Sequence, residues 1–105
     1  MSDVTLDDFA AVHAAGAQVI DVREPAEYVA GNVPGAASIP MGQLPGRLAE
    51  IDRSRPVFVV CQAGGRSAAM ADVLLQHGYD AHSVTGGTAA WTTAGRPVDT
   101  APEAK

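Results

Sequence analysis

The most constraining feature of the sequence is an apolar run that ends at its one cysteine. Residues 57–60 read Val-Phe-Val-Val, and Cys61 follows directly. A short run that is apolar at every position is typical of a strand buried on both faces of a sheet. A glycine-bearing segment, residues 62–67, comes next and leads into a helical pattern over residues 67–77. The sequence therefore predicts a central strand that passes through a short loop into a helix, where open α/β sheets place their chemistry.

The segment 62–67 gives the cysteine surroundings that favour reactivity. Its glycines let the backbone turn N–H groups inward, and the start of the helix adds free N–H groups and the positive end of its dipole. Both favour the thiolate, which is the nucleophilic form of cysteine. We predict that Cys61 is a reactive nucleophile in a cradle of N–H groups that binds anions. The alternative is an inert cysteine at the end of a core strand.

Short strands and helices alternate along the rest of the chain. Strands are expected over residues 18–23, 36–40, 57–60 and 81–85, with a strand stub at Val4, and helices over residues 5–15, 24–28, 43–51, 67–77 and 88–94. Such short connections require parallel pairing with right-handed crossovers. The expected fold is α/β: a small three-layer sandwich with a mostly parallel central sheet, helices on both faces, and strand 57–60 in the centre. Residues 1–97 should form one domain and residues 98–105 a flexible C-terminal tail.

Composition narrows the classes of partner and compartment. The net charge is −5 and Lys105 is the only lysine, so no basic patch marks nucleic acid as a partner. A single cysteine excludes an internal disulfide. Because the chain also shows no signal-peptide pattern and no apolar run of membrane-spanning length, we expect a cytoplasmic protein without a membrane partner.

Four motifs, in this order along the chain, carry a resemblance to a known family. They are Asp21-Val22-Arg23-Glu24, then Glu27-Tyr28-x-x-Gly31-Asn32-Val33-Pro34-Gly35-Ala36, then Cys61-x-x-Gly64-x-Arg66-Ser67, and finally Gly86-Gly87-x-x-x-Trp91. Together they resemble the single-domain rhodaneses, which are sulfurtransferases that form a persulfide. The resemblance extends to about Pro97.

The resemblance implies an activity and a set of site residues. The cysteine would accept a sulfane sulfur from a donor such as thiosulfate and pass it, as a persulfide, to cyanide, to a thiol or to a protein acceptor. No metal or cofactor is implied beyond the covalent persulfide on Cys61. The implied catalytic residue is Cys61, the substrate-binding residues are Gln62, Ala63, Gly64, Gly65, Arg66 and Ser67, and the residues that support the loop are Asp21 and Arg23.

Several roles within these motifs stay open or depart from the family. Arg66 either faces the donor and binds an oxyanion, which we favour, or folds back onto a carboxylate and supports the loop. Ser67 either caps the helix or bonds within the loop. Asn32 stands where the family often has histidine, and we expect a local change in hydrogen bonding with activity retained. Because Gln62 and Ala63 are neutral, we expect thiosulfate to serve as a test donor and not as the physiological one.

Two other classes of protein are alternatives to a sulfurtransferase. Phosphatases and arsenate reductases that use a cysteine place five residues between cysteine and arginine, whereas here four residues separate Cys61 from Arg66. The shorter loop between Cys61 and Arg66 encloses a smaller space, which suits one sulfur atom better than phosphate. A non-catalytic binding module on the same fold would usually have lost the cysteine. The three histidines stand in helix or strand contexts, so none is expected to act as a base for Cys61.

Overall fold

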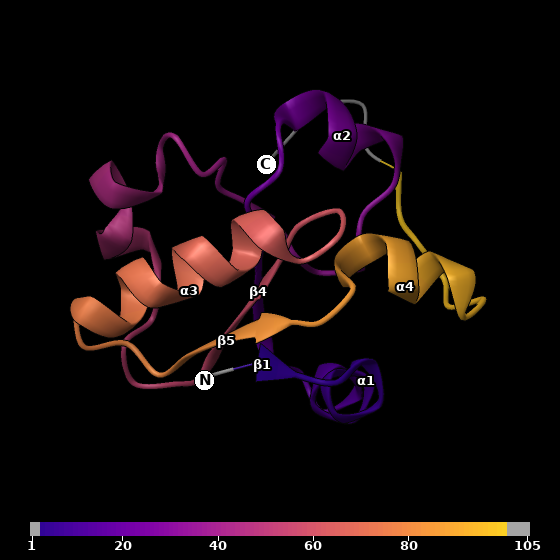
Figure 1. The fold of residues 1–105 in the computed structure, drawn as a ribbon, viewed down its shortest axis with the longest axis horizontal. Coiled ribbons are helices and arrows are strands. Elements are labelled where there is room, and N and C mark those ends of the chain that lie inside the picture. Colours follow the sequence, from indigo (N-terminus) through magenta and orange to yellow (C-terminus); the bar gives the residue numbers. More distant parts are fainter. Residues whose placement is uncertain (1–2, 101–105) are drawn as a thin grey trace.

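The computed structural model describes residues 3–100, which form a sheet of five strands covered by helices (Figure 1). In chain order the elements are β1 (Asp3–Val4), α1 (Leu6–Ala14), β2 (Gln18–Asp21), α2 (Pro25–Ala30), β3 (Ala37–Ser38), the 3₁₀ turns η1 (Leu44–Gly46) and η2 (Leu48–Glu50), β4 (Val57–Val60), α3 (Gly65–Gln76), β5 (Ala81–Val84) and α4 (Gly87–Thr93). The strand order is β1-β5-β4-β2-β3, and every neighbouring pair is parallel. The predicted α/β fold, with residues 57–60 as the central strand, is confirmed.

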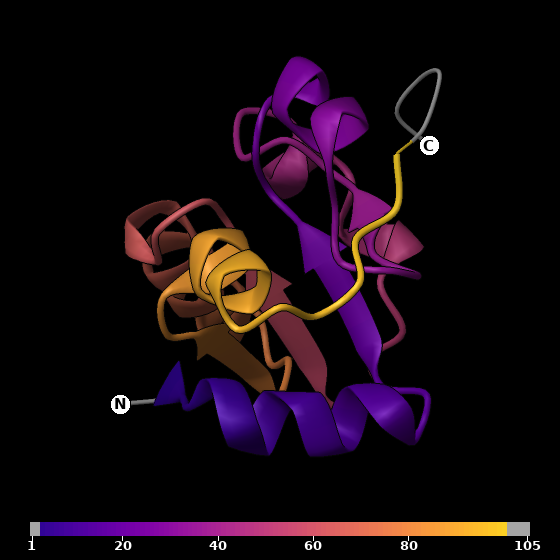
Figure 2. The ribbon, with the colours of Figure 1, turned by 90° about the vertical axis from the view of Figure 1, so that its right-hand side faces the viewer.

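Two apolar cores lie on the two faces of the sheet. Figures 1 and 2 show α3 and the 3₁₀ turns on one face and α1 and α4 on the other. The α3-face core includes Ile20, Leu44, Val59, Cys61, Met70 and Leu74. The core on the opposite face includes Phe9, Val19, Tyr28, Phe58 and Trp91. Because successive residues of β4 point to opposite faces, all four of them are buried, as the continuous apolar run predicted.

The first residues of the described chain form a short edge strand and the capped start of a helix. Thr5 caps α1, since its Oγ1 accepts a hydrogen bond of 3.1 Å from the Asp8 N–H. Val4 belongs to the edge strand β1, which pairs with β5.

Trp91 is 3% exposed and packs edge-on against Phe9, with ring centroids 5.6 Å apart. The tryptophan is therefore a packing anchor for α4.

The helix predicted over residues 43–51 is wrong. In its place the chain forms the two 3₁₀ turns η1 and η2, separated by Arg47 with φ −124°. Pro45 lacks an N–H, and Gly46 after it is a weak helix former, so a regular helix does not propagate through this pair. Apolar residues of this segment still pack against the sheet, because Leu44 and Ile51 are both buried in the α3-face core.

The C-terminal segment returns to the connection between α2 and β3. Asp99 and Asn32 exchange two backbone hydrogen bonds, each 2.9 Å long, and the Trp91 Nε1–H donates to the Pro97 carbonyl at 2.7 Å. Figure 2 shows this segment running from α4 towards the α2 side of the molecule. Residues 101–105 of the predicted tail lie outside the described residues, and the domain limit at Pro97 stays a prediction. No helix within residues 3–100 has the length and apolar character needed to cross a membrane.

Candidate active site

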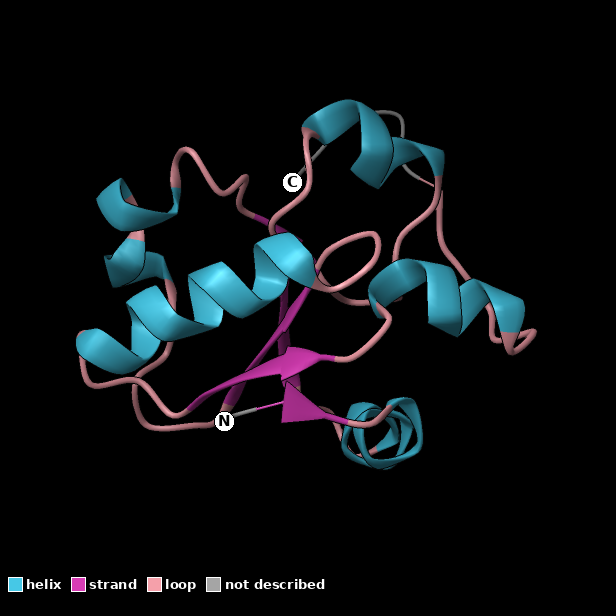
Figure 3. Cartoon of the chain, in the orientation of Figure 1, coloured by secondary structure: helices cyan, strands magenta, loops and turns pink. Residues whose placement is uncertain are grey.

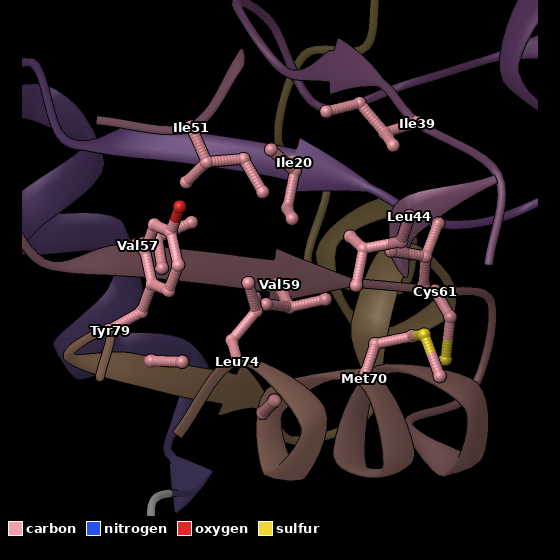
Figure 4. Close-up of a cluster of buried hydrophobic side chains, with 13 residues drawn as sticks. Ile20, Ile39, Leu44, Ile51, Val57, Val59, Cys61, Met70, Leu74 and Tyr79 are labelled. Carbon is pink, nitrogen blue, oxygen red and sulfur yellow. The ribbon is translucent and has the colours of Figure 1, made fainter. Parts of the chain in front are cut away.

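Cys61 follows the last residue of β4, at the carboxyl end of the central strand. Figure 3 shows the chain making one rounded loop between β4 and α3. The helix begins at Gly65, two residues earlier than predicted, and Gly64 is its N-terminal cap with φ 117°. That conformation lies in the region that favours glycine, so Gly64 is what lets the loop close tightly enough to face the cysteine. Figure 4 shows Cys61 at the end of the α3-face core, with Leu44 and Met70.

The Cys61 sulfur is buried and meets hydrogen-bonding groups from the loop. The residue is 1% exposed. The Gly64 N–H donates to Sγ at 3.0 Å, and the Ser67 Oγ lies 3.4 Å from Sγ. Ser67 is also fully buried, and its hydroxyl donates to the Gly64 carbonyl at 3.0 Å. Ser67 therefore bonds within the loop, and the helix cap is Gly64.

These contacts set the acidity of the thiol. Burial acts to raise the pKa of Cys61, but hydrogen bonds from the Ser67 side chain and from the N–H groups of Ser67, Gly64 and Ala63 outweigh it and lower the pKa below its ordinary value. The same N–H groups can hold a negative charge one atom further out, on a persulfide. The loop can thus generate a nucleophile and stabilise an anion attached to it.

Asp21 and Arg23 form a buried ion pair beside the loop. The Arg23 Nη2 lies 2.8 Å from the Asp21 Oδ2, and the two residues are 3% and 0% exposed. The remaining Arg23 donors reach the Gln62 side chain at 3.1 Å and the Gly31 carbonyl at 2.7 Å. A buried ion pair needs such additional bonds to offset the loss of water. The pair therefore connects the end of β2, the loop and the turn after α2.

Arg66 is held by a carboxylate of α2. Its Nη1 and Nη2 lie 2.7 and 3.0 Å from the two carboxylate oxygens of Glu27. The Arg66 guanidinium is the main reason that the pKa of Glu27 falls to about 2, so the pair is charged on both sides at neutral pH. This is the contact expected if Arg66 supports the loop, and not the donor-facing orientation that we favoured. Sequence reasoning missed Glu27, although it stands in the second motif.

The start of α4 supports the loop from the other side. The Thr88 N–H donates to the Cys61 carbonyl at 2.8 Å, and the Ala89 N–H donates to the Gln62 carbonyl at 3.0 Å. Gly87 has φ +55°, and a Cβ there would overlap the Cys61 carbonyl oxygen. The glycine pair of the fourth motif thus permits a close approach of α4 to the cysteine. Spacing alone could not show that contact.

The remaining polar residues that the motifs singled out are bonded elsewhere. Asn32 is 2% exposed, and its Nδ2 donates to the Tyr28 carbonyl at 2.9 Å, so its role in this fold is structural. The histidines are bonded to other groups: His13 to the Pro34 carbonyl, His77 to the Val73 carbonyl and His82 to the Asp80 carboxylate. The acidity of Cys61 thus depends on hydrogen bonds from its own loop.

A strand, a loop of N–H donors around a buried cysteine, and a helix on a five-stranded parallel sheet define the rhodanese class of α/β domain. The family model for the rhodanese-like domain matches residues 5–94, and the chain belongs to this family. It is 38% identical to a sulfurtransferase of Allochromatium vinosum, over 81% of this chain and 79% of that protein.

Solved structures agree with this assignment. The crystal structure of a rhodanese-related protein from Thermoplasma volcanium matches with a TM-score of 0.87 and 31% identity, over 93% of this chain and 97% of that one. A rhodanese-like domain protein from Staphylococcus aureus matches with a TM-score of 0.81 and 33% identity, over 87% of this chain and 91% of that one. The expected family and fold are therefore confirmed.

Proposed function

We propose that this protein is a sulfurtransferase that carries one sulfane sulfur as a persulfide on Cys61. The observation that supports this most is the position of the Cys61 Sγ, 3.0 Å from the Gly64 N–H in a loop that lowers the pKa of the thiol. The sulfurtransferase of Allochromatium vinosum, at 38% identity, supports the same class of reaction. The catalytic residue is Cys61, and the loop residues 62–67 bind the transferred sulfur.

The transfer consists of two displacements at sulfur. The Cys61 thiolate attacks the outer sulfur of thiosulfate, the S–S bond of the donor breaks, and sulfite leaves with the electron pair of that bond. Cyanide or a thiolate then attacks the terminal sulfur of the Cys61 persulfide, and Cys61 leaves as a thiolate. Atoms and charge balance in both steps without a further oxidant or reductant. We propose a small thiol or a protein thiol as the natural acceptor.

The pairing of Arg66 argues against the phosphatase alternative. A phosphatase of this kind needs its loop arginine to bind the oxygens of the substrate, whereas both terminal nitrogens of Arg66 are bonded to Glu27. The lowered pKa of Cys61 argues against a binding module without catalysis, since an inert buried cysteine has a raised pKa. Sulfur transfer remains the function that uses each of these features.

The proposal is tested by the intact mass of the reduced protein after incubation with thiosulfate. We expect a mass increase of one sulfur atom, which disappears on addition of cyanide or dithiothreitol. Thiosulfate is the convenient donor, and an organic trisulfide and inorganic polysulfide extend the test to other sulfane donors. Failure of all three to produce the adduct would contradict the proposed function.

Replacement of Arg66 by alanine distinguishes its two roles. Because the guanidinium is bonded to Glu27, we expect Arg66→Ala to lower kcat/KM on the order of tenfold to a hundredfold, equally for thiosulfate and for an uncharged organic trisulfide. Glu27→Gln, which keeps the arginine but breaks the charged pair, should cause a loss of the same kind with both donors. Arg47→Ala is the matched control, since Arg47 forms a similar pair with Glu50 on the 3₁₀ segment.

A loss confined to thiosulfate would instead assign Arg66 to the donor. In that case Glu27→Gln should leave the use of thiosulfate unchanged or improve it, because the guanidinium would be released. The two variants together thus separate support of the loop from recognition of an anion.

A further inference from the structure

A second buried serine lies behind the cysteine loop and is not used by the mechanism above. Ser83 is in β5, where it pairs with Val59 of β4, and it is 3% exposed. Its Oγ lies 2.8 Å from the Ser67 Oγ, which in turn lies 3.4 Å from the Cys61 Sγ. The two hydroxyls and the sulfur therefore form a continuous row inside the protein.

The number of protons in this row limits how it can be arranged. Each hydroxyl carries one proton and can accept further bonds. When Cys61 is a thiol, its S–H can donate to the Ser67 Oγ while Ser67 donates to the Gly64 carbonyl. When Cys61 is a thiolate, the Ser67 proton is needed at the sulfur. The Ser67 oxygen can then accept the proton of Ser83.

The rearrangement leaves no buried group without a partner. The Gly64 carbonyl loses the Ser67 proton, but it still accepts a hydrogen bond of 3.1 Å from the Ala68 N–H. In the thiolate state the row then runs in one direction, with Ser83 donating to Ser67 and Ser67 donating to the sulfur. Hydrogen bonds in such a chain polarise and strengthen one another.

We propose that Ser83 is a positioning residue, whose hydroxyl donates to Ser67 and so directs the Ser67 proton to the Cys61 thiolate. Ser83 does not touch the sulfur in this arrangement and acts only through Ser67. The inference concerns the acidity of Cys61, and it can be tested whether or not the protein transfers sulfur.

The charged groups around the loop are already paired. Arg66 of α3 is bonded to Glu27 of α2, and Arg23 is bonded to Asp21 at the end of β2. His82, next to Ser83 in β5, points to the other face of the sheet, where it stacks on Phe58 and meets Asp80. The neighbours of Cys61 from β4, η1 and α3 in the core are apolar: Val59, Leu44 and Met70. A change of the Cys61 titration in a Ser83 variant therefore reports on the row of hydroxyls.

The test is the titration of the single cysteine in Ser83→Ala, followed by the ultraviolet absorbance of the thiolate and by the rate of alkylation with iodoacetamide at each pH. We expect the midpoint to rise by about half to one pH unit and alkylation below the midpoint to slow by about threefold to tenfold, the effect of losing one hydrogen bond. Ser83→Thr keeps a hydroxyl and should restore most of the original midpoint. Ser38→Ala is the matched control, because Ser38 is 1% exposed and its Oγ has no hydrogen-bond partner among the described residues.

Three outcomes would overturn the role of Ser83. They are a Ser83→Ala titration that coincides with that of the unchanged protein, a Ser83→Thr titration shifted as far as Ser83→Ala, and a Ser38→Ala titration shifted equally. Thermal unfolding of each variant shows that the comparison is between folded proteins. Sulfur uptake is measured separately, so a shifted midpoint in a protein that takes up no sulfur would retain the role of Ser83 and contradict the proposed function.

Discussion

We expect Cys61→Ser to take up no sulfur from any donor, because a serine hydroxyl cannot form a persulfide. The substitution keeps the size of the side chain nearly constant, and the Gly64 N–H that donates to Sγ at 3.0 Å can donate to an oxygen in its place. We therefore expect a folded protein without the mass increase that is expected of the unchanged protein after incubation with thiosulfate. The formation of thiocyanate from thiosulfate and cyanide should fall to the rate without protein.

The single cysteine makes this result easy to interpret. Any sulfur retained by Cys61→Ser would have to sit on another type of residue, since the chain has no second thiol. A persistent adduct that cyanide removes would place the nucleophile elsewhere and contradict the assignment of Cys61. The circular dichroism of the variant should match that of the unchanged protein, which separates loss of chemistry from loss of fold.

Gly87→Ala has the largest expected effect on stability among the substitutions that leave the cysteine in place. Gly87 has φ +55°, and an added Cβ would overlap the Cys61 carbonyl oxygen and lie 3.0 Å from the Gln62 carbonyl oxygen. The start of α4 must then move away, which breaks the hydrogen bonds from Thr88 and Ala89 to the loop. We expect a loss of about 2–4 kcal/mol in the free energy of unfolding. We also expect persulfide formation to slow by roughly tenfold or more, since the loop amides lose their alignment.

Denaturant unfolding and the mass of the thiosulfate adduct measure the two effects of Gly87→Ala. Gly42→Ala is the control, because Gly42 is exposed, has open space around it and does not adopt a positive φ. It should leave both measurements unchanged. A stable Gly87→Ala protein that forms the persulfide at the original rate would show that the contact between α4 and the loop is not needed.

The sequence predicted local structure best where a residue type strongly favours one local conformation or position. The apolar run 57–60 predicted the central strand because a short run that is apolar at every position is typical of a strand buried on both faces. The helix expected from residue 5 begins directly after Thr5, which caps it, and the glycines after Cys61 predicted a loop with inward N–H groups. Each of these inferences depends on neighbours within a few residues along the chain.

Contacts between distant segments could not be predicted in this way. Arg66 and Glu27 are separated by 39 positions, and their pairing depends on where α2 lies over the loop. Two interpretations of Arg66 were therefore open from the sequence. In the structure its guanidinium pairs with a carboxylate, as expected for the role that we did not favour. The helix over residues 43–51 failed for a different reason, because apolar spacing records which side chains are buried and does not distinguish an α-helix from two 3₁₀ turns.

The two backbone hydrogen bonds between Asn32 and Asp99 connect the segment after α4 to residues that contact the cysteine loop. Asp99 holds the backbone of Asn32, the neighbouring Gly31 carbonyl accepts from Arg23, and Arg23 binds the Gln62 side chain beside the cysteine. Three hydrogen-bonded contacts thus connect the segment after α4 to the residue next to Cys61. The hydrogen-bonded support of the cysteine loop therefore extends to Asp99, a residue outside all four motifs.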